Sequence, residues 1–90
     1  MQYRAQEDAF VVRQIGEESV IVPINAPLEK VYQTNSTGTV LVRALAEWRS
    51  EQELFEVLRA EFEAPSDEQL ANDVRSFLRA MEEVGFVEAK

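Results

Sequence analysis

The chain has 90 residues, 46% of them hydrophobic, and carries a formal net charge of −8. This length leaves room for one domain with one modest core, and the composition is that of a globular chain. Nucleic acid and anionic membrane surfaces repel so acidic a protein on average, because binding to phosphates depends on clustered Lys and Arg. The absence of cysteine and histidine excludes disulfides, thiolate zinc sites and the commonest general base.

No apolar run approaches the length of a membrane span, and residues 1–8 lack the basic-then-apolar layout of a secretion signal. We therefore expect a cytoplasmic protein that does not contact membranes. Residues 1–8 are mostly polar and offer little to bury, so we expect them to be flexible. No repeat or linker divides the chain, and residues 1–90 are expected to form a single domain.

Three short segments rich in β-branched residues come first. Residues 9–15 and 19–24 flank a break that contains Gly16, a pattern typical of a β-hairpin. Pro23 cannot donate a ladder hydrogen bond, so it belongs near the end of its strand or on an edge. After a loop of turn residues, residues 30–34 predict a third strand, which a three-stranded meander leaves at an edge of the sheet.

From residue 35 onward the apolar residues recur with the period of helices. Asn35 or Ser36 can cap a first helix. The apolar stripe expected on that helix consists of Leu41, Leu45 and Trp48, with Val40 and Ala44 beside it. Ser50 and Glu53 form a capping box that begins a second helix. Its expected buried face consists of Leu54, Phe55, Leu58 and Phe62.

The third helix is the longest. Ser66 with Gln69 gives a second capping box at its start, and Gly85 is placed to end it with a left-handed cap. Spacings of three and four define a seam on one face, formed by Leu70, Val74, Phe77, Met81 and Val84. Residues 86–87 then give a short apolar tail. The chain therefore predicts an α+β fold in which a three-stranded antiparallel sheet is followed by three helices.

The sequence lacks the usual arrangements of catalytic residues. It has three glycines and no glycine-rich phosphate loop, and a Ser or Thr nucleophile would need activation by Lys30 or Lys90, the only lysines. Carboxylate pairs such as Glu82 and Glu83 are expected on solvated helix faces of so acidic a chain. We therefore expect no enzyme activity, no cofactor and no metal site.

A three-helix unit beside a small sheet is also typical of winged-helix DNA-binding regulators. The helix that would enter the groove of DNA spans residues 67–84. Its charged residues are Asp67, Glu68, Asp73, Glu82 and Glu83 against Arg75 and Arg79. Because this balance repels phosphates, a DNA-binding regulator is the less favoured alternative.

The predicted strand at residues 30–34 offers a different kind of site. An edge strand exposes N–H and C=O groups with which a guest peptide can pair, and the long helix can form the opposite wall of a groove. Most sheets have edges that recruit nothing, and this edge is short and carries Lys30. The pattern alone leaves both interpretations open.

Several segments resemble those of PqqD-like proteins. Residues 31–38, Val-Tyr-Gln-Thr-Asn-Ser-Thr-Gly, are similar to the segment that closes the third strand and begins the first helix in that family. Residues 73–78, Asp-Val-Arg-Ser-Phe-Leu, look like the family's Asp-Val-x-x-Phe-Leu signature in its last helix, and residues 84–87 look like its Gly-Leu-Val ending. The similarity runs over about residues 9–88 in the family's order and spacing.

This resemblance implies a stand-alone, winged-helix-like recognition element that binds the leader segment of a ribosomally synthesised precursor peptide. The leader would add as an antiparallel strand between the third strand and the third helix. A processing enzyme, namely a leader peptidase, a cyclase or a radical-SAM protein, would then receive it. Carried over by position, the peptide-binding residues are Lys30, Val31, Tyr32, Gln33, Thr34, Asp73, Val74 and Phe77. We expect a monomer.

The chain also departs from the family pattern. Thr34 stands where the family usually has leucine, and Val42 where a bulky residue is common. These departures speak against the quinone-cofactor protein itself and are compatible with an element of a lasso-peptide or related pathway. The alternatives are an adaptor subunit of a biosynthetic enzyme complex and a peptide chaperone of PQQ biosynthesis.

Individual site residues have two interpretations each. Tyr32 either contacts a leader side chain or packs across the sheet. The face of the sheet toward which its side chain points decides between these two roles. Asp73 either receives a positively charged or hydroxyl-bearing leader residue or pairs within the domain. Val74 and Phe77 lie on the apolar seam and are expected to belong mainly to the core.

Overall fold

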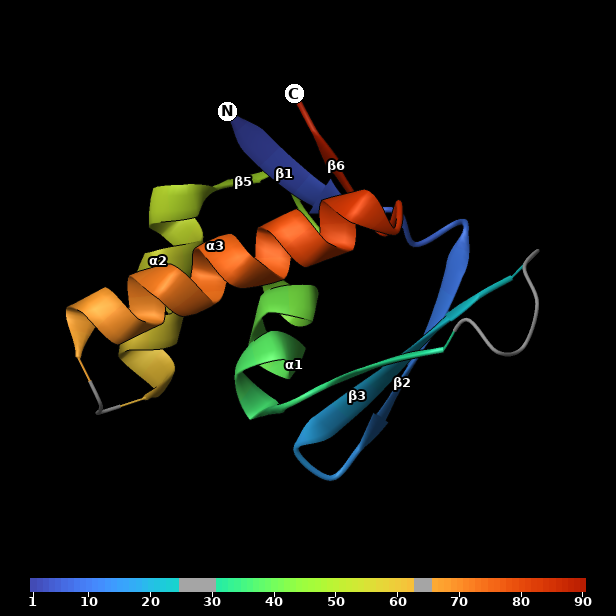
Figure 1. Cartoon of the computed structure of the whole chain (residues 1–90), viewed down its shortest axis with the longest axis horizontal. Coiled ribbons are helices and arrows are strands. Elements are labelled where there is room, and N and C mark those ends of the chain that lie inside the picture. The colour runs from blue at the N-terminus through green and yellow to red at the C-terminus, as the bar shows by residue number, and fades with distance from the viewer. Residues whose placement is uncertain (25–30, 63–65) are drawn as a thin grey trace.

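A computed structural model describes residues 1–24, 31–62 and 66–90, which form two small β-sheets and three helices (Figure 1). The first sheet has the antiparallel order β2-β3-β4 and consists of β2 (Phe10–Ile15), β3 (Glu18–Pro23) and β4 (Tyr32–Thr34). The helices are α1 (Ser36–Ala44), α2 (Glu51–Glu61) and α3 (Asp67–Glu83). The second sheet has the order β5-β1-β6 and consists of β1 (Gln2–Ala5), β5 (Arg49–Ser50) and β6 (Val87–Ala89). The α+β fold with a three-stranded antiparallel sheet and three helices is confirmed.

The hairpin of β2 and β3 follows from local sequence. Val12 lies opposite Ile21, and Ile15 lies opposite Glu18 at the turn. Gly16 begins this turn with a φ of 65°, a left-handed conformation that glycine adopts without the steric cost of a Cβ. One glycine between two β-branched segments was therefore sufficient to predict the hairpin.

The first sheet has an inner face toward the helices and an outer face toward solvent. Ser19 and Ile21 of β3 are buried on the inner face. Thr34 and Tyr32 pair with these two residues and share their face, because directly opposite residues point the same way. The Ser19 Oγ and the Thr39 Oγ1 lie 2.8 Å apart and join β3 to α1. Val20 of β3 and Gln33 of β4, which alternate with these inner-face residues, point to the outer face.

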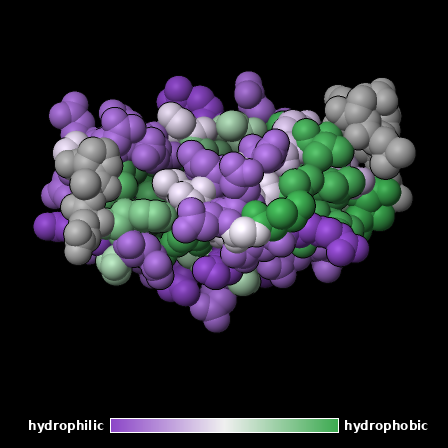
Figure 2. Space-filling model, turned by 90° about the horizontal axis from the view of Figure 1, so that it is seen from below, coloured by the Kyte–Doolittle hydropathy of each residue, from purple (hydrophilic) through white to green (hydrophobic). Residues whose placement is uncertain are grey.

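The outer face carries exposed apolar side chains. Val11 and Ile15 of β2 are 43% and 68% exposed, and Ile24 and Val31, just beyond the strand ends, are 52% and 45% exposed. Figure 2 views the molecule from below Figure 1 and shows hydrophobic residues gathered on the right, where this sheet lies. Most of the remaining surface in that view is hydrophilic.

The core lies between the three helices and the inner face of the first sheet. From α3 it receives Leu70, Val74, Leu78 and Met81. The sequence predicted Phe77 and Val84 on this seam, but both are only partly buried. Steps of three and four residues are both compatible with one helix face, so the pattern left open which neighbour of Val74 turns inward. The other core residues are Ala5, Ile21, Leu41, Val42, Leu45, Leu54, Leu58, Phe86 and Val87.

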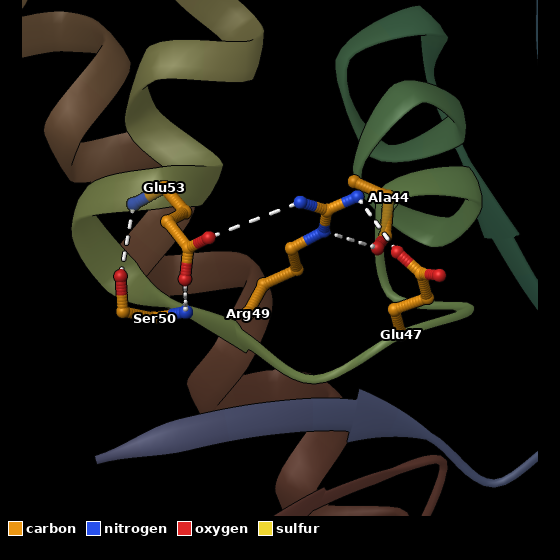
Figure 3. A network of polar contacts seen from close by, with 5 residues as sticks. All are labelled: Ala44, Glu47, Arg49, Ser50 and Glu53. Atoms are coloured by element: carbon orange, nitrogen blue, oxygen red, sulfur yellow. Dashed lines mark hydrogen bonds and ion pairs between the residues drawn. The ribbon is translucent and has the colours of Figure 1, made fainter.

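The starts of α1 and α2 have the caps expected from the sequence. Asn35 accepts a backbone hydrogen bond at its Oδ1, and Ser50 and Glu53 form the complete capping box shown in Figure 3. The hydrogen bond from the Ser50 backbone N–H is the main cause that lowers the pKa of Glu53 below its ordinary value. Arg49 donates from its Nε to the Ala44 carbonyl oxygen at 3.2 Å and thereby joins the end of α1 to the start of α2 (Figure 3).

The ends of α3 are fixed by one side chain and one glycine. Ser66 Oγ accepts a hydrogen bond from the Gln69 backbone N at 3.1 Å. The Gln69 side chain donates to the Asp73 Oδ1 at 3.1 Å, so the reciprocal half of the expected capping box is not formed. Gly85 has a φ of 85° after the helix, which confirms the predicted left-handed cap.

Trp48 does not belong to the apolar stripe of α1, as the sequence predicted, because the helix ends at Ala44. Its ring is instead flanked by two cations. The Arg4 Cζ lies 4.9 Å and the Lys90 Nζ 4.5 Å from the ring centroid. Such cation–π contacts hold the tryptophan against the second sheet while leaving it partly exposed.

Residues near the start of the chain, Gln2–Ala5, form β1, a strand that was not predicted from the sequence. The strand lies between β5 and β6, and backbone hydrogen bonds of 2.8 and 2.9 Å join Gln2 to Lys90. Ala5 is buried in the core. This strand was not predicted because its partners are distant in sequence and only Ala5 and part of Tyr3 supply an apolar signal.

Candidate functional site

β4 is an open edge of the first sheet. It pairs with β3 through Thr34 opposite Ser19 and Tyr32 opposite Ile21, and among the described residues no strand pairs with its other side. Main-chain N–H and C=O groups on that side are available to an added strand. The edge by itself is a common feature of sheets, so its surroundings decide whether it is a site.

A groove with a volume of about 330 Å³ lies beside this edge, between the junction of β4 with α1 and the side of α3. Its apolar lining consists of Gly38, Leu41, Phe77, Ala80 and Met81. Its polar lining consists of Gln33, Thr34, Asn35, Thr37, Asp73 and Ser76. An apolar lining with a few polar groups is typical of ligand sites. The open edge and the groove therefore form one candidate site.

Four of the site residues named from the sequence line this groove. Gln33 and Thr34 reach it from β4, whereas Asp73 and Phe77 reach it from successive turns of α3. Phe77 is only partly buried, because the core seam runs through Leu78. Its ring is therefore shared between the core and the groove.

The other four named residues are placed differently. Tyr32 belongs to β4 but turns its side chain to the inner face, where it packs against the core. Val31 precedes the strand and is exposed. Val74 is completely buried in the core, so its side chain does not face the groove. Lys30 lies outside the described residues.

Seven lining residues were not identified from the sequence: Asn35, Thr37, Gly38, Leu41, Ser76, Ala80 and Met81. A signal existed for those on α3, since positions three, seven and eight after Asp73 share its helix face. The residues from α1 gave no such signal. They reach the groove because the first turn of α1 packs between β4 and α3, which is a tertiary feature.

Gly38 makes this close packing possible. A Cβ at its position would lie 2.6 Å from the Thr34 Cβ and Oγ1 and 3.4 Å from the Phe77 Cε1. The 2.6 Å separations from Thr34 are far inside van der Waals contact, whereas 3.4 Å from Phe77 is an ordinary contact, so any side chain here would push β4 away from α1. The glycine therefore sets the distance between α1 and β4 beside the groove.

Asp73 is the only charged residue among the described residues that line the groove. Its Oδ1 accepts the hydrogen bond from Gln69, which comes from the same helix. No cation is paired with it in the described part of the chain. The groove thus has a single negative charge against an otherwise neutral lining.

A larger cavity of about 500 Å³ borders α3 on another side. It is lined by Tyr3, Glu51, Arg75, Leu78, Arg79, Glu82 and Glu83. The Arg75 Nε and the Glu51 Oε1 lie 3.8 Å apart across it. Burial raises the pKa of Tyr3, and the carboxylates of Glu82 and Glu51 add to this effect. Among the described residues that line it, none belongs to a strand at the edge of a sheet, and most are charged.

The described residues contain no group of three or more His, Cys, Asp or Glu side chains close enough to hold a metal ion. Within the same ranges, no helix has the length and apolar character required to cross a membrane. The groove beside β4 is the candidate site because it combines a strand edge with a lining of apolar and polar residues.

The fold and the groove define a winged-helix-like α+β domain with an open edge strand. The family described as "Coenzyme PQQ synthesis protein D (PqqD)" matches residues 18–87, and the chain belongs to this family. A solved structure described as "TbiB1 in Complex with the TbiA(beta) Leader Peptide" matches with a TM-score of 0.77 and 22% identity, over 97% of this chain and 96% of that chain. This likeness establishes the shared fold. Curated protein sequences gave no significant match.

Proposed function

We propose that this protein binds the leader region of a ribosomally synthesised precursor peptide and delivers it to a processing enzyme. Two findings support the proposal. The chain belongs to the PqqD family, and a protein of the same fold is described in complex with a leader peptide. The single observation that carries it is the open edge of β4 beside a partly apolar groove.

The leader binds as an added strand antiparallel to β4. Each main-chain hydrogen bond to this edge contributes about 1 kcal/mol net. One or two apolar side chains buried against Phe77 and Leu41 contribute about 1.5–3 kcal/mol each. Ordering a flexible leader opposes these gains, so the dissociation constant is expected between high nanomolar and micromolar.

The residues named from the sequence have distinct roles in this proposal. Gln33, Thr34, Asp73 and Phe77 contact the leader directly from the groove walls. Val31 and Tyr32 contribute main-chain groups, since the Tyr32 side chain packs against the core. Val74 holds α3 in place from within the core. We propose that Lys30 also contacts the leader.

The protein works by binding and presentation without catalysis. It acts as a cytoplasmic monomer in a lasso-peptide or related pathway, without a cofactor. The partner is a leader peptidase, a cyclase or a radical-SAM protein that acts on the precursor. A flexible leader held in one orientation beside such an enzyme raises the local concentration of substrate.

Fluorescence polarisation tests this proposal directly. A labelled leader from the precursor peptide encoded beside this gene is titrated with the purified protein. Saturable binding near or below micromolar, competed by unlabelled leader and not by the core segment, is the expected result. A folded protein that binds no leader would contradict the proposal and favour an adaptor that contacts only its enzyme.

The mode of binding is tested at Val31. Val31→Pro removes a main-chain donor just before β4, whereas Val31→Thr keeps the donor and changes the side chain only. We expect the proline variant to bind about tenfold or more weakly and the threonine variant to bind within about twofold of the original chain. Strand addition at this edge is wrong if the folded proline variant binds normally.

A further inference from the structure

The groove changes in polarity along α3. Asp73 and Ser76 line it first, and Phe77, Ala80 and Met81 follow toward the C-terminal end of the helix. Phe77 lies at the middle, next to the point where α1 leaves β4, because a Cβ at Gly38 would contact both Thr34 and Phe77. The groove therefore has an acidic end and an apolar end, with the end of β4 between them.

The direction of the guest follows from the directions of β4 and α3. In Figure 1, β4 is the unlabelled teal strand beside β3 and runs from right to left toward the start of α1, whereas α3 runs from left to right. A strand antiparallel to β4 consequently runs in the same direction as α3. Its earlier residues pass Asp73, and its later residues pass Phe77 and then Met81.

The spacing follows from the rise per residue of the two structures. A helix rises about 1.5 Å and a strand about 3.3 Å per residue. The four residues from Asp73 to Phe77 thus span about 6 Å, or about two strand residues. The eight residues from Asp73 to Met81 span about 12 Å, or about four strand residues. Both are even numbers, so the three guest side chains point to the same face.

The chemistry at the first of these positions is set by Asp73. It is the only charge among the described residues that line the groove, and the chain as a whole carries −8. A cation on the guest gains from the carboxylate and from the field of the whole protein, whereas an acidic guest residue is opposed by both. The apolar lining further along favours apolar side chains at the later positions.

We infer that the leader accepted by this groove carries an Arg or Lys that meets Asp73, followed toward its C-terminus by apolar side chains two and four residues later. This inference rests on the proposed function and adds the charge, the order and the spacing of the guest. The same residues in the reverse order place the cation beside Met81 and an apolar side chain beside Asp73. The groove therefore discriminates peptides of identical composition.

A display library of random 12-residue peptides tests the inference without knowledge of the natural precursor. Parallel selections use the original protein, Asp73→Lys and Glu83→Lys. Peptides that also bind Val31→Pro are discarded, because they do not use the β4 edge. Glu83→Lys is the matched control, since it makes the same change of charge on α3 outside the groove. With the original protein and with Glu83→Lys, we expect the selected peptides to carry Arg or Lys at one position and apolar residues two and four positions later. With Asp73→Lys we expect Asp or Glu at that place.

A pair of synthetic peptides then measures the effect of order. One follows the selected order and the other reverses it, and we expect the first to bind about three- to tenfold more tightly. Equal affinities, or a basic preference that persists with Asp73→Lys, would overturn the inference while leaving peptide binding at this edge intact. A folded protein that selects no peptide at all would count against the proposed function as well.

Discussion

The two sides of α3 border cavities of opposite character. The larger cavity, toward Tyr3, is lined mostly by charged residues, and Arg75 and Glu51 face each other across it at 3.8 Å. The smaller groove, toward β4, has one charge, an apolar lining and an open strand edge beside it. A ligand in the larger cavity must displace water from charges that are already well solvated. Beside the smaller groove, by contrast, the main-chain groups on the outer side of β4 pair with no strand among the described residues. Volume is therefore a poorer indicator of function than the groups left without partners.

The largest loss of stability and leader affinity is expected from a substitution at Gly38. Gly38→Val places side-chain atoms where even a Cβ would lie 2.6 Å from Thr34, so β4 must move away from α1. We expect a loss of about 1–3 kcal/mol in the free energy of unfolding from overpacking and a loss of leader affinity of tenfold or more. Urea unfolding and fluorescence polarisation measure the two effects.

A second variant distinguishes overpacking at Gly38 from a general effect on α1. Thr34→Gly in the Gly38→Val background removes the Thr34 side chain that blocks the new one. Partial recovery of stability is expected from this pair. Equal stability of Gly38→Val and the original chain would contradict the close packing described here.

A smaller effect on leader affinity is expected when one side chain on each side of α3 is replaced in turn. Phe77→Ala removes a ring shared between groove and core, which should lower leader affinity about tenfold and the free energy of unfolding by about 1–3 kcal/mol. Arg79→Ala acts on the charged cavity and should change leader affinity less than twofold and stability by less than about 0.5 kcal/mol. Similar losses of affinity for both variants would remove the distinction between the two sides.

The smallest effect concerns Tyr3 in the charged cavity. Its pKa is raised above the ordinary value by burial and by Glu82 and Glu51, so the folded state favours the neutral phenol. A raised folded-state pKa contributes stability below the unfolded pKa of about 10, and this contribution is lost as the pH rises through the folded value. We expect the thermal midpoint to fall more steeply above this pH for the original chain than for Tyr3→Phe, with leader binding at neutral pH unchanged.

Local sequence predicted the elements whose signals are local. The caps at Asn35 and Ser50, the turn at Gly16 and the end of α3 at Gly85 each depend on one or two neighbouring residues, and all are present. β1 escaped prediction because its partners are β5 and β6, which lie far along the chain. Trp48 was misplaced because the sequence pattern did not show that α1 ends at Ala44.

The candidate site shows the same division between local and tertiary features. Thr34, Asp73 and Phe77 line the groove, and they were named in advance because the resemblance to PqqD-like proteins carried them over by position. The position of Phe77 depends on which of two overlapping seams faces the core, and the structure selects the seam with Leu78. Gly38 could be assigned no role until its distance from Thr34 was known.

The second sheet has a practical consequence for how the domain can be attached to other proteins. Gln2 and Lys90 exchange two backbone hydrogen bonds, so the second and the last residue of the sequence lie side by side. Figure 1 shows both ends at the top, away from the β2–β3–β4 sheet at the lower right. A short linker between the two ends would permit circular permutation, with new termini at the Gly16 turn. Insertion of the whole domain into a surface loop of a carrier enzyme would require almost no spacer and would leave β4 facing outward.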